Sequence, residues 1–61
     1  MPIVTIEMFE GRSVEQKKKT AKEVTKVVAG GVGCTENDVI VLFRDIPKQN
    51  WAMGGELASE K

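Results

Sequence analysis

The feature that most limits the fold of this chain is the run VIVLF at residues 39–43, which is apolar throughout and rich in β-branched side chains. Such a run is typical of a β-strand that is buried on both faces. The chain offers only one helical segment, and one helix covers only one face of a two-stranded sheet. We therefore expect a second subunit to cover the other face.

A first strand is predicted at residues 3–9, IVTIEMF, from the loose alternation of its side chains. One face of this strand is apolar and the other is mixed; the first carries Val4, Ile6 and Met8, and the second Ile3, Thr5, Glu7 and Phe9. With a helix between the two strands, the predicted unit is β-α-β, of the α/β (α+β) class. Its strands are then parallel and its crossover right-handed.

The helix is predicted to run from Val14 to about Val32, because Ser13 and Gln16 have the spacing of an N-terminal capping box. The glycines at its far end have poor helix propensity and are expected to stop it. The expected inward face consists of Val14, Ala21, Val24, Val28 and Gly31, and the lysines expected to face water are Lys17, Lys18, Lys22 and Lys26.

The tail, IPKQNWAMGGELASEK, contains the only tryptophan of the chain and a Gly-Gly pair. Residues 48–53 are interpreted as a small hairpin or arm. A solitary hairpin is only marginally stable in water, so we expect this arm to pack on a neighbouring subunit. No repeat or linker interrupts the sequence, and residues 1–61 are interpreted as a single domain.

The length of the chain also favours assembly. A protein of 61 residues buries only about 60% of the surface that its unfolded form exposes. Small domains usually compensate with disulfides, a structural metal or oligomerisation. The chain has one cysteine, Cys34, and no histidine, so no intramolecular disulfide is available and no metal site is indicated. Oligomerisation remains as the expected means of stabilisation.

The charge balance and hydropathy of the chain argue against nucleic acid and membranes as partners. Nine Lys and Arg balance nine Asp and Glu, whereas nucleic-acid-binding modules normally carry a basic excess. The one basic cluster, residues 17–19, is interpreted as a solvated helix face. No apolar stretch approaches the ~20 residues of a membrane span, and no signal peptide leads the chain. We expect a soluble, cytoplasmic protein that binds neither nucleic acid nor membranes.

Pro2 is the residue with the most distinct chemistry. The usual nucleophilic constellations are absent, since there is no histidine and Cys34 has no partner base. Removal of Met1 would leave Pro2 with a free secondary amine, and the reference pKa of an α-amine is about 7.7–8.0. An apolar pocket and a nearby cation would both lower that pKa. A base with a pKa near the working pH is well suited to take and return a proton.

Arg12 is the candidate for the nearby cation. It follows the predicted first strand, whereas Pro2 precedes it, and seven residues at about 3.3 Å each separate the two by roughly 20 Å. Arg12 could therefore reach a Pro2 only in a different subunit. The alternative interpretation is that Arg12 is simply a loop arginine near the start of a helix.

Three segments together resemble the 4-oxalocrotonate tautomerase family: MPIVTIEMFEGRSVEQKKK, VIVLFRDI and NWAMGGELASEK. The match covers nearly the whole chain. The resemblance implies a β-α-β fold in which two subunits form a four-stranded sheet and three such dimers form a hexamer. It also implies catalysis without a cofactor.

The resemblance further implies roles for three residues. Pro2 matches the catalytic base of the family, which moves a proton within a 2-hydroxydienoate or other enol acid to give the conjugated 2-oxo acid. Arg12 matches an arginine that comes from a neighbouring subunit and binds the distal carboxylate of the substrate. Trp51 matches an aromatic wall of the site. The small-molecule enol or 2-oxo acid and further copies of the chain are the partners that this implies.

One position departs from the family. Its better-characterised members carry a second arginine near the start of the second strand, and this chain has Ile40 there. Arg44 lies four residues further on, about 13 Å away, and is not a simple replacement. Two alternatives therefore remain open: a weakly active or non-catalytic subunit of a tautomerase-fold assembly, and a proline-assisted hydratase or dehalogenase of unsaturated acids.

Overall fold

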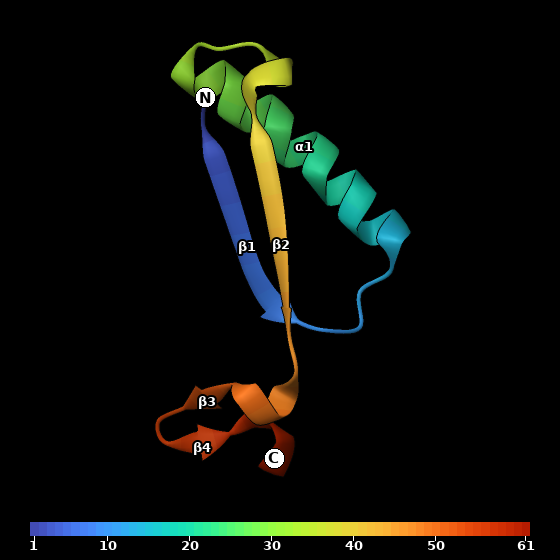
Figure 1. Ribbon diagram of the computed structural model, residues 1–61, viewed down its shortest axis with the longest axis vertical. Helices are drawn as coiled ribbons and strands as arrows, with labels where there is room; N and C mark the ends of the chain where they lie inside the picture. Colours follow the sequence, from blue (N-terminus) through green and yellow to red (C-terminus); the bar gives the residue numbers. More distant parts are fainter.

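Two parallel strands joined by one helix form the body of the molecule. The computed structural model describes residues 1–61 and contains strand β1 (Ile3–Phe9), helix α1 (Val14–Val32) and strand β2 (Ile40–Ile46) (Figure 1). Residue by residue, β1 pairs in parallel with β2, from Ile3 with Ile40 to Phe9 with Ile46. The predicted β-α-β unit is therefore confirmed.

Helix α1 begins and ends as its sequence predicts. The Ser13 hydroxyl accepts a hydrogen bond from the Gln16 N–H at 3.1 Å, and the Gln16 side-chain oxygen accepts one from the Ser13 N–H at 2.9 Å. This is the reciprocal capping box. At the other end Gly33 adopts a φ of +78°, and its N–H donates to the Ala29 carbonyl, as in a left-handed glycine cap.

One face of the sheet is covered by α1. The side chains of β1 and β2 that point toward the helix are half-buried, and Ala29 of α1, at 7% exposure, is the single fully buried residue. The expected inward face was wrong at its ends, because Val14 and Gly31 are exposed. For Val14 the reason is visible in Figure 1: α1 crosses the strands obliquely, and its first turn diverges from the sheet.

Lys17 also departs from the prediction. Instead of facing water it is half-buried and forms an ion pair with Asp45 of β2. The partner lies 28 residues away in the sequence. The long lysine side chain spans the space between the diverging helix and the sheet with its methylene groups and keeps its charge paired.

The other face of the sheet is open. Ile3, Leu42 and Ile40, which point away from α1, are 63%, 50% and 38% exposed. Only one face of the apolar second strand is therefore covered within the chain.

Strand β2 is longer and starts later than predicted, at Ile40–Ile46 instead of Val39–Phe43. Val39 is used by the preceding 3₁₀ turn (Glu36–Asp38), where its N–H donates to the Glu36 carbonyl. At the other end Arg44, Asp45 and Ile46 stay in register with β1, because the ladder is made by the backbone and tolerates charged side chains.

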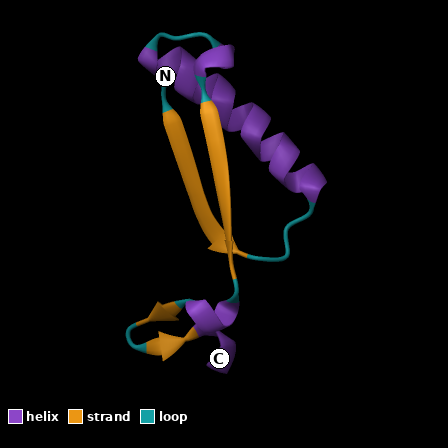
Figure 2. Ribbon diagram, in the orientation of Figure 1, coloured by secondary structure: helices purple, strands orange, loops and turns teal.

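The tail forms a hairpin, although not at the predicted residues. Lys48–Asn50 is a 3₁₀ turn, and the hairpin consists of β3 (Ala52–Met53) and β4 (Glu56–Leu57). Gly54 and Gly55 connect its strands with φ values of +62° and +85°. Positive φ at both central residues is the requirement of a type I′ turn, which glycine meets without strain. The hairpin extends beyond the end of β2 as an arm (Figure 2).

The chain is more extended than a compact domain of the same length. It measures 42 × 24 × 13 Å, with a radius of gyration of 14.5 Å, whereas a compact domain of this length has about 10.5 Å. Its accessible surface is 4785 Å², compared with roughly 3,900 Å² for a compact protein of this mass. The apolar sheet face and the projecting arm account for this shape, and both are suited to contact other subunits. Helix α1 lacks a stretch long and apolar enough to cross a lipid bilayer.

We expect Leu42→Lys to weaken self-association, because it places a further charge beside the exposed isoleucines Ile3 and Ile40 of the open sheet face. Sedimentation at several protein concentrations should show the dissociation constant of the assembly rising by about 100-fold or more, which corresponds to ~2.8 kcal/mol. Lys18→Glu, on the exposed side of α1, is the control. Unchanged sedimentation of Leu42→Lys would mean that this face is not the interface.

Candidate active site

Pro2 lies at the start of β1 and is held there by the backbone. Its carbonyl accepts a hydrogen bond from the Ile40 N–H at 3.0 Å, which extends the β1–β2 ladder by one rung. Pro2 is half-buried, while Met1 is 84% exposed. The nitrogen of residue 2 is therefore at a fixed place at one end of the sheet, and the residue that precedes it is accessible.

Arg12 lies at the opposite end of β1. It is exposed in the connection to α1, directly before the capping residue Ser13. Gly11 turns the chain there with a φ of +118°, a value that other residues rarely adopt. The seven residues of β1 separate Arg12 from Pro2 by at least about 20 Å. Figure 1 shows the N-terminus and the β1–α1 connection at opposite ends of the sheet.

Trp51 is at the Arg12 end of the sheet. Its ring packs on Phe9, the last residue of β1, with ring centroids 4.4 Å apart and planes inclined by 54°. The Trp51 carbonyl accepts from the Ala58 N–H at 2.8 Å, which ties it to the end of the hairpin arm. Lys48 places its Nζ 5.7 Å from the centroid of the Phe9 ring.

The sequence pattern indicates Trp51 as a site residue but gives no signal for Phe9 or Lys48. Phe9 was assigned only to the mixed face of its strand, and no local pattern connects it with a tryptophan 42 residues later. Parallel register supplies the connection, because it sets Phe9 beside Ile46, where the arm begins.

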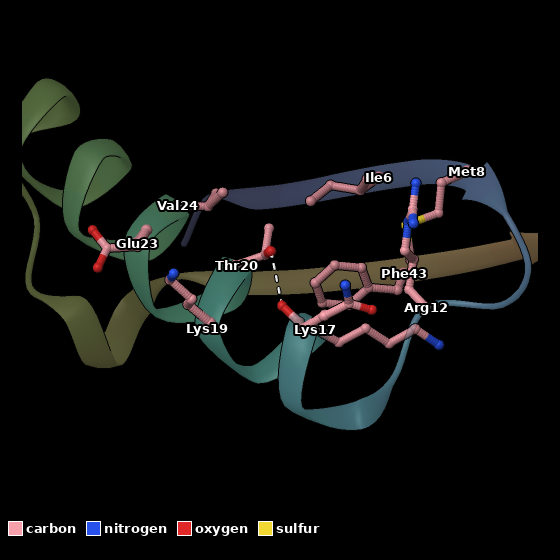
Figure 3. A pocket seen from close by; sticks show the side chains of 10 residues that line it. Ile6, Met8, Arg12, Lys17, Lys19, Thr20, Glu23, Val24 and Phe43 are labelled. Atoms are coloured by element: carbon pink, nitrogen blue, oxygen red, sulfur yellow. Dashed lines mark hydrogen bonds between the residues drawn. The ribbon is translucent and has the colours of Figure 1, made fainter.

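A groove of about 470 Å³ separates α1 from the sheet and includes only one of the three predicted site residues, Arg12. Its floor is apolar and its rim polar (Figure 3); the lining consists of Ile6, Met8, Arg12, Gln16, Lys17, Lys19, Thr20, Glu23, Val24 and Phe43. The groove can hold a small apolar group beside a cation. Pro2 lies outside it.

Within one chain the predicted site residues are therefore divided between two ends of the sheet. Pro2 is at one end with Ile40, and Arg12 and Trp51 are at the other. A site that contains all three requires at least two subunits. No three His, Cys, Asp or Glu side chains gather in a cluster that could hold a metal ion.

Three features define a tautomerase-like α+β protein. They are a β-α-β unit with one open sheet face, a C-terminal arm, and a proline fixed at the first rung of the sheet. The family model described as "Tautomerase enzyme" matches residues 2–61, and the chain belongs to this family.

Curated relatives match along their full length. A probable tautomerase from Bacillus cereus is 41% identical over 61 residues and is covered completely, as is this chain. A 2-hydroxymuconate tautomerase from Comamonas testosteroni is 43% identical over 60 residues, which cover 98% of this chain and 95% of the relative.

Solved structures show the same fold. YwhB, a homologue of 4-oxalocrotonate tautomerase, superposes with a TM-score of 0.93 at 33% identity, over 98% of each chain. A heterohexameric 4-oxalocrotonate tautomerase from Chloroflexus aurantiacus superposes with a TM-score of 0.92 at 30% identity, over 98% of this chain and 97% of that one. The predicted fold class and family are thus confirmed.

We expect the Phe9–Trp51 contact to hold the arm against the sheet. In a double-mutant cycle of Phe9→Leu and Trp51→Leu, the coupling in the free energy of unfolding should be about 0.5–1.5 kcal/mol at a fixed protein concentration. Phe43→Leu, on the helix-facing side of β2, should show no coupling with Trp51→Leu. Additive effects of Phe9→Leu and Trp51→Leu would mean that the two rings act independently.

Proposed function

We propose that this chain is an enol–keto tautomerase that acts without a cofactor on a 2-hydroxydienoate or another enol form of a 2-oxo acid, with Pro2 as general acid–base. The observation that carries the proposal is the fixed position of Pro2 in a member of the tautomerase family. The Pro2 carbonyl accepts a hydrogen bond from the Ile40 N–H, which holds the residue at the end of the sheet. The 2-hydroxymuconate tautomerase from Comamonas testosteroni supports the class of substrate.

The proposed reaction moves one proton. With Met1 removed, the lone pair of the Pro2 nitrogen takes a proton from the 2-hydroxyl of the dienol, or from C3 of the unconjugated keto form. The electron pair of the broken bond shifts into the conjugated system and forms a dienolate. The protonated Pro2 then returns the proton at C5, which gives the conjugated 2-oxo acid. No electrons pass to an acceptor, so the chemistry needs no redox group.

Arg12 and Trp51 of neighbouring subunits complete the proposed site. A guanidinium near Pro2 would bind a substrate carboxylate with two parallel hydrogen bonds. It would also lower the pKa of the Pro2 amine, because a like charge disfavours the protonated form. The indole of Trp51 would exclude water and lower the pKa further by desolvation.

The assembly that we propose is a homohexamer, a trimer of dimers in which each dimer forms a four-stranded sheet. The open sheet face with Ile3 and Leu42 supports the packing of the dimers on one another, because edge-to-edge pairing into a four-stranded sheet leaves that face uncovered. The separation of Pro2 from Arg12 supports a site between subunits, because the chain alone keeps the two apart.

A second candidate function is that of a non-catalytic or weakly active subunit in a mixed assembly. It is favoured by Ile40, whose N–H bonds the Pro2 carbonyl. The better-characterised tautomerases that the chain resembles carry a second arginine at this position. If the purified chain assembles alone and converts enol acids, this candidate is excluded.

The Pro2 proposal is tested by blocking the nitrogen. An added residue before Pro2 converts its amine into an amide without basicity, so kcat/KM should fall by about 10²–10⁴-fold, the usual contribution of general acid–base catalysis. The matched control adds the same residue after Lys61. Intact mass must first establish that Met1 is absent from the reference protein. Equal activity of blocked and unblocked chains would place the base elsewhere.

The Arg12 proposal predicts that Arg12→Ala raises KM more than it lowers kcat, with kcat/KM reduced by about 10–100-fold for the loss of a charged hydrogen-bond donor. Arg12→Lys should restore part of the affinity but not the paired geometry. Lys18→Ala is the control.

The same variant tests whether the site is shared. Mixing Arg12→Ala chains with N-terminally blocked chains, followed by dissociation and reassembly, should recover activity, because some sites then combine an intact Pro2 with an intact Arg12. Absence of recovery in mixed assemblies would mean that Pro2 and Arg12 do not act together in one site.

A further inference from the structure

The connection between β1 and α1 is fastened to strand β2 on both sides of Arg12. Before Arg12, the Glu10 N–H donates a hydrogen bond to the Ile46 carbonyl at 3.2 Å. After it, the side chain of Lys17 forms its ion pair with Asp45. The two anchors on β2 are consecutive residues, so the segment that contains Arg12 begins and ends at neighbouring positions of the sheet.

Lys17 also belongs to the first turn of α1, which starts directly after Arg12. Its N–H donates a hydrogen bond to the Ser13 carbonyl at 3.1 Å. Ser13 is held in turn by the capping box with Gln16. Because these bonds fix the geometry of the turn, the position of Lys17 determines that of Ser13 and, through it, the direction in which the chain leaves Arg12.

The pair of Lys17 with Asp45 is the one ion pair between α1 and the sheet. Apolar packing is weak at this end of the helix, where Val14 is 77% exposed. The side chains of Lys17 and Asp45 are only 26% and 38% exposed, so water and salt screen the pair less than a fully exposed one. An electrostatic contact therefore takes the place of apolar packing where the helix diverges from the sheet.

The guanidinium of Arg12 is left unpaired by this arrangement. Arg12 is exposed and forms no ion pair, although Asp45 lies at the same end of the sheet. Figure 3 shows the side chains of Arg12 and Lys17 at one end of the groove. Because Lys17 occupies the Asp45 carboxylate, that carboxylate does not compete with an acid for the guanidinium.

We infer that Lys17 and Asp45 are positioning residues for Arg12. The inference rests on the carboxylate-binding role proposed for Arg12. The ion pair holds the connection in the conformation that directs the guanidinium toward a substrate carboxylate, and it keeps Asp45 from binding Arg12. Both residues act through Arg12 and not on the reacting atoms.

The kinetics of Lys17→Met test this role. We expect KM for the enol acid to rise by about fivefold while kcat stays within about twofold, because Arg12 is present but less well placed. Lys17→Arg keeps a charge that can bond the same carboxylate, so its KM should stay near that of the unsubstituted chain. Lys18→Met is the matched control, since Lys18 is exposed and unpaired. An unchanged KM in an active Lys17→Met chain overturns the inference.

Asp45→Asn completes a double-mutant cycle and preserves the shape of the side chain. Alone it should also raise KM. Added to Lys17→Met it should raise KM no further, because the pair is already broken and no unpaired carboxylate is left to compete for Arg12. If the two increases multiply in the double variant, the residues act separately and the inference is wrong.

Nuclear magnetic resonance relaxation separates this inference from the proposed function. In Lys17→Met, the order parameters of the Gly11 and Arg12 amides should fall from about 0.85, typical of rigid backbone, to below about 0.6, while those of residues 52–57 stay unchanged. If no enol acid is converted by any chain, only the tautomerase proposal fails, and this loss of order supports the inference. Unchanged order at Gly11 and Arg12 overturns it whatever the kinetics.

Discussion

The parallel pairing of β1 with β2 is the constraint on which the rest of the structure depends. Its first rung is the hydrogen bond from the Ile40 N–H to the Pro2 carbonyl, and its last is the bond from the Glu10 N–H to the Ile46 carbonyl. Parallel strands need a crossover, which is α1, and the crossover covers one face only. Register thus sends Pro2 to one end of the sheet and Arg12 to the other, and leaves an apolar face for a second subunit.

Local sequence patterns were sufficient for much of this fold. Strand β1, the capping box of Ser13 and the glycine at the end of α1 depend on neighbouring residues and could be predicted. The ion pair of Lys17 with Asp45 could not, because nothing in the helical pattern reveals a partner 28 residues away. The hairpin is a different case. Gly54 and Gly55 are a recognisable turn signal, but the strands that they connect are Ala52–Met53 and Glu56–Leu57, not residues 48–53 as predicted.

The candidate site was accessible to sequence reasoning only in part. The chemistry of Pro2 follows from its side chain and position, whereas the roles of Arg12 and Trp51 came from resemblance to a family. The separation of Pro2 from Arg12 follows from the length of a strand alone, and β1 has the predicted length. The contact of Trp51 with Phe9 depends on where the arm folds back, which no periodicity in the sequence encodes.

At the first rung of the sheet, the position of Pro2 does not depend on the side chain of its partner residue. Ile40 secures Pro2 through its peptide N–H, not through its side chain. Any residue except proline supplies the same donor, so the side chain at position 40 can change size or charge while the neighbouring nitrogen keeps its place. A chain built in this way can acquire a new substrate preference by a single substitution beside the proposed base. Position 40 can therefore be substituted during evolution without displacing Pro2.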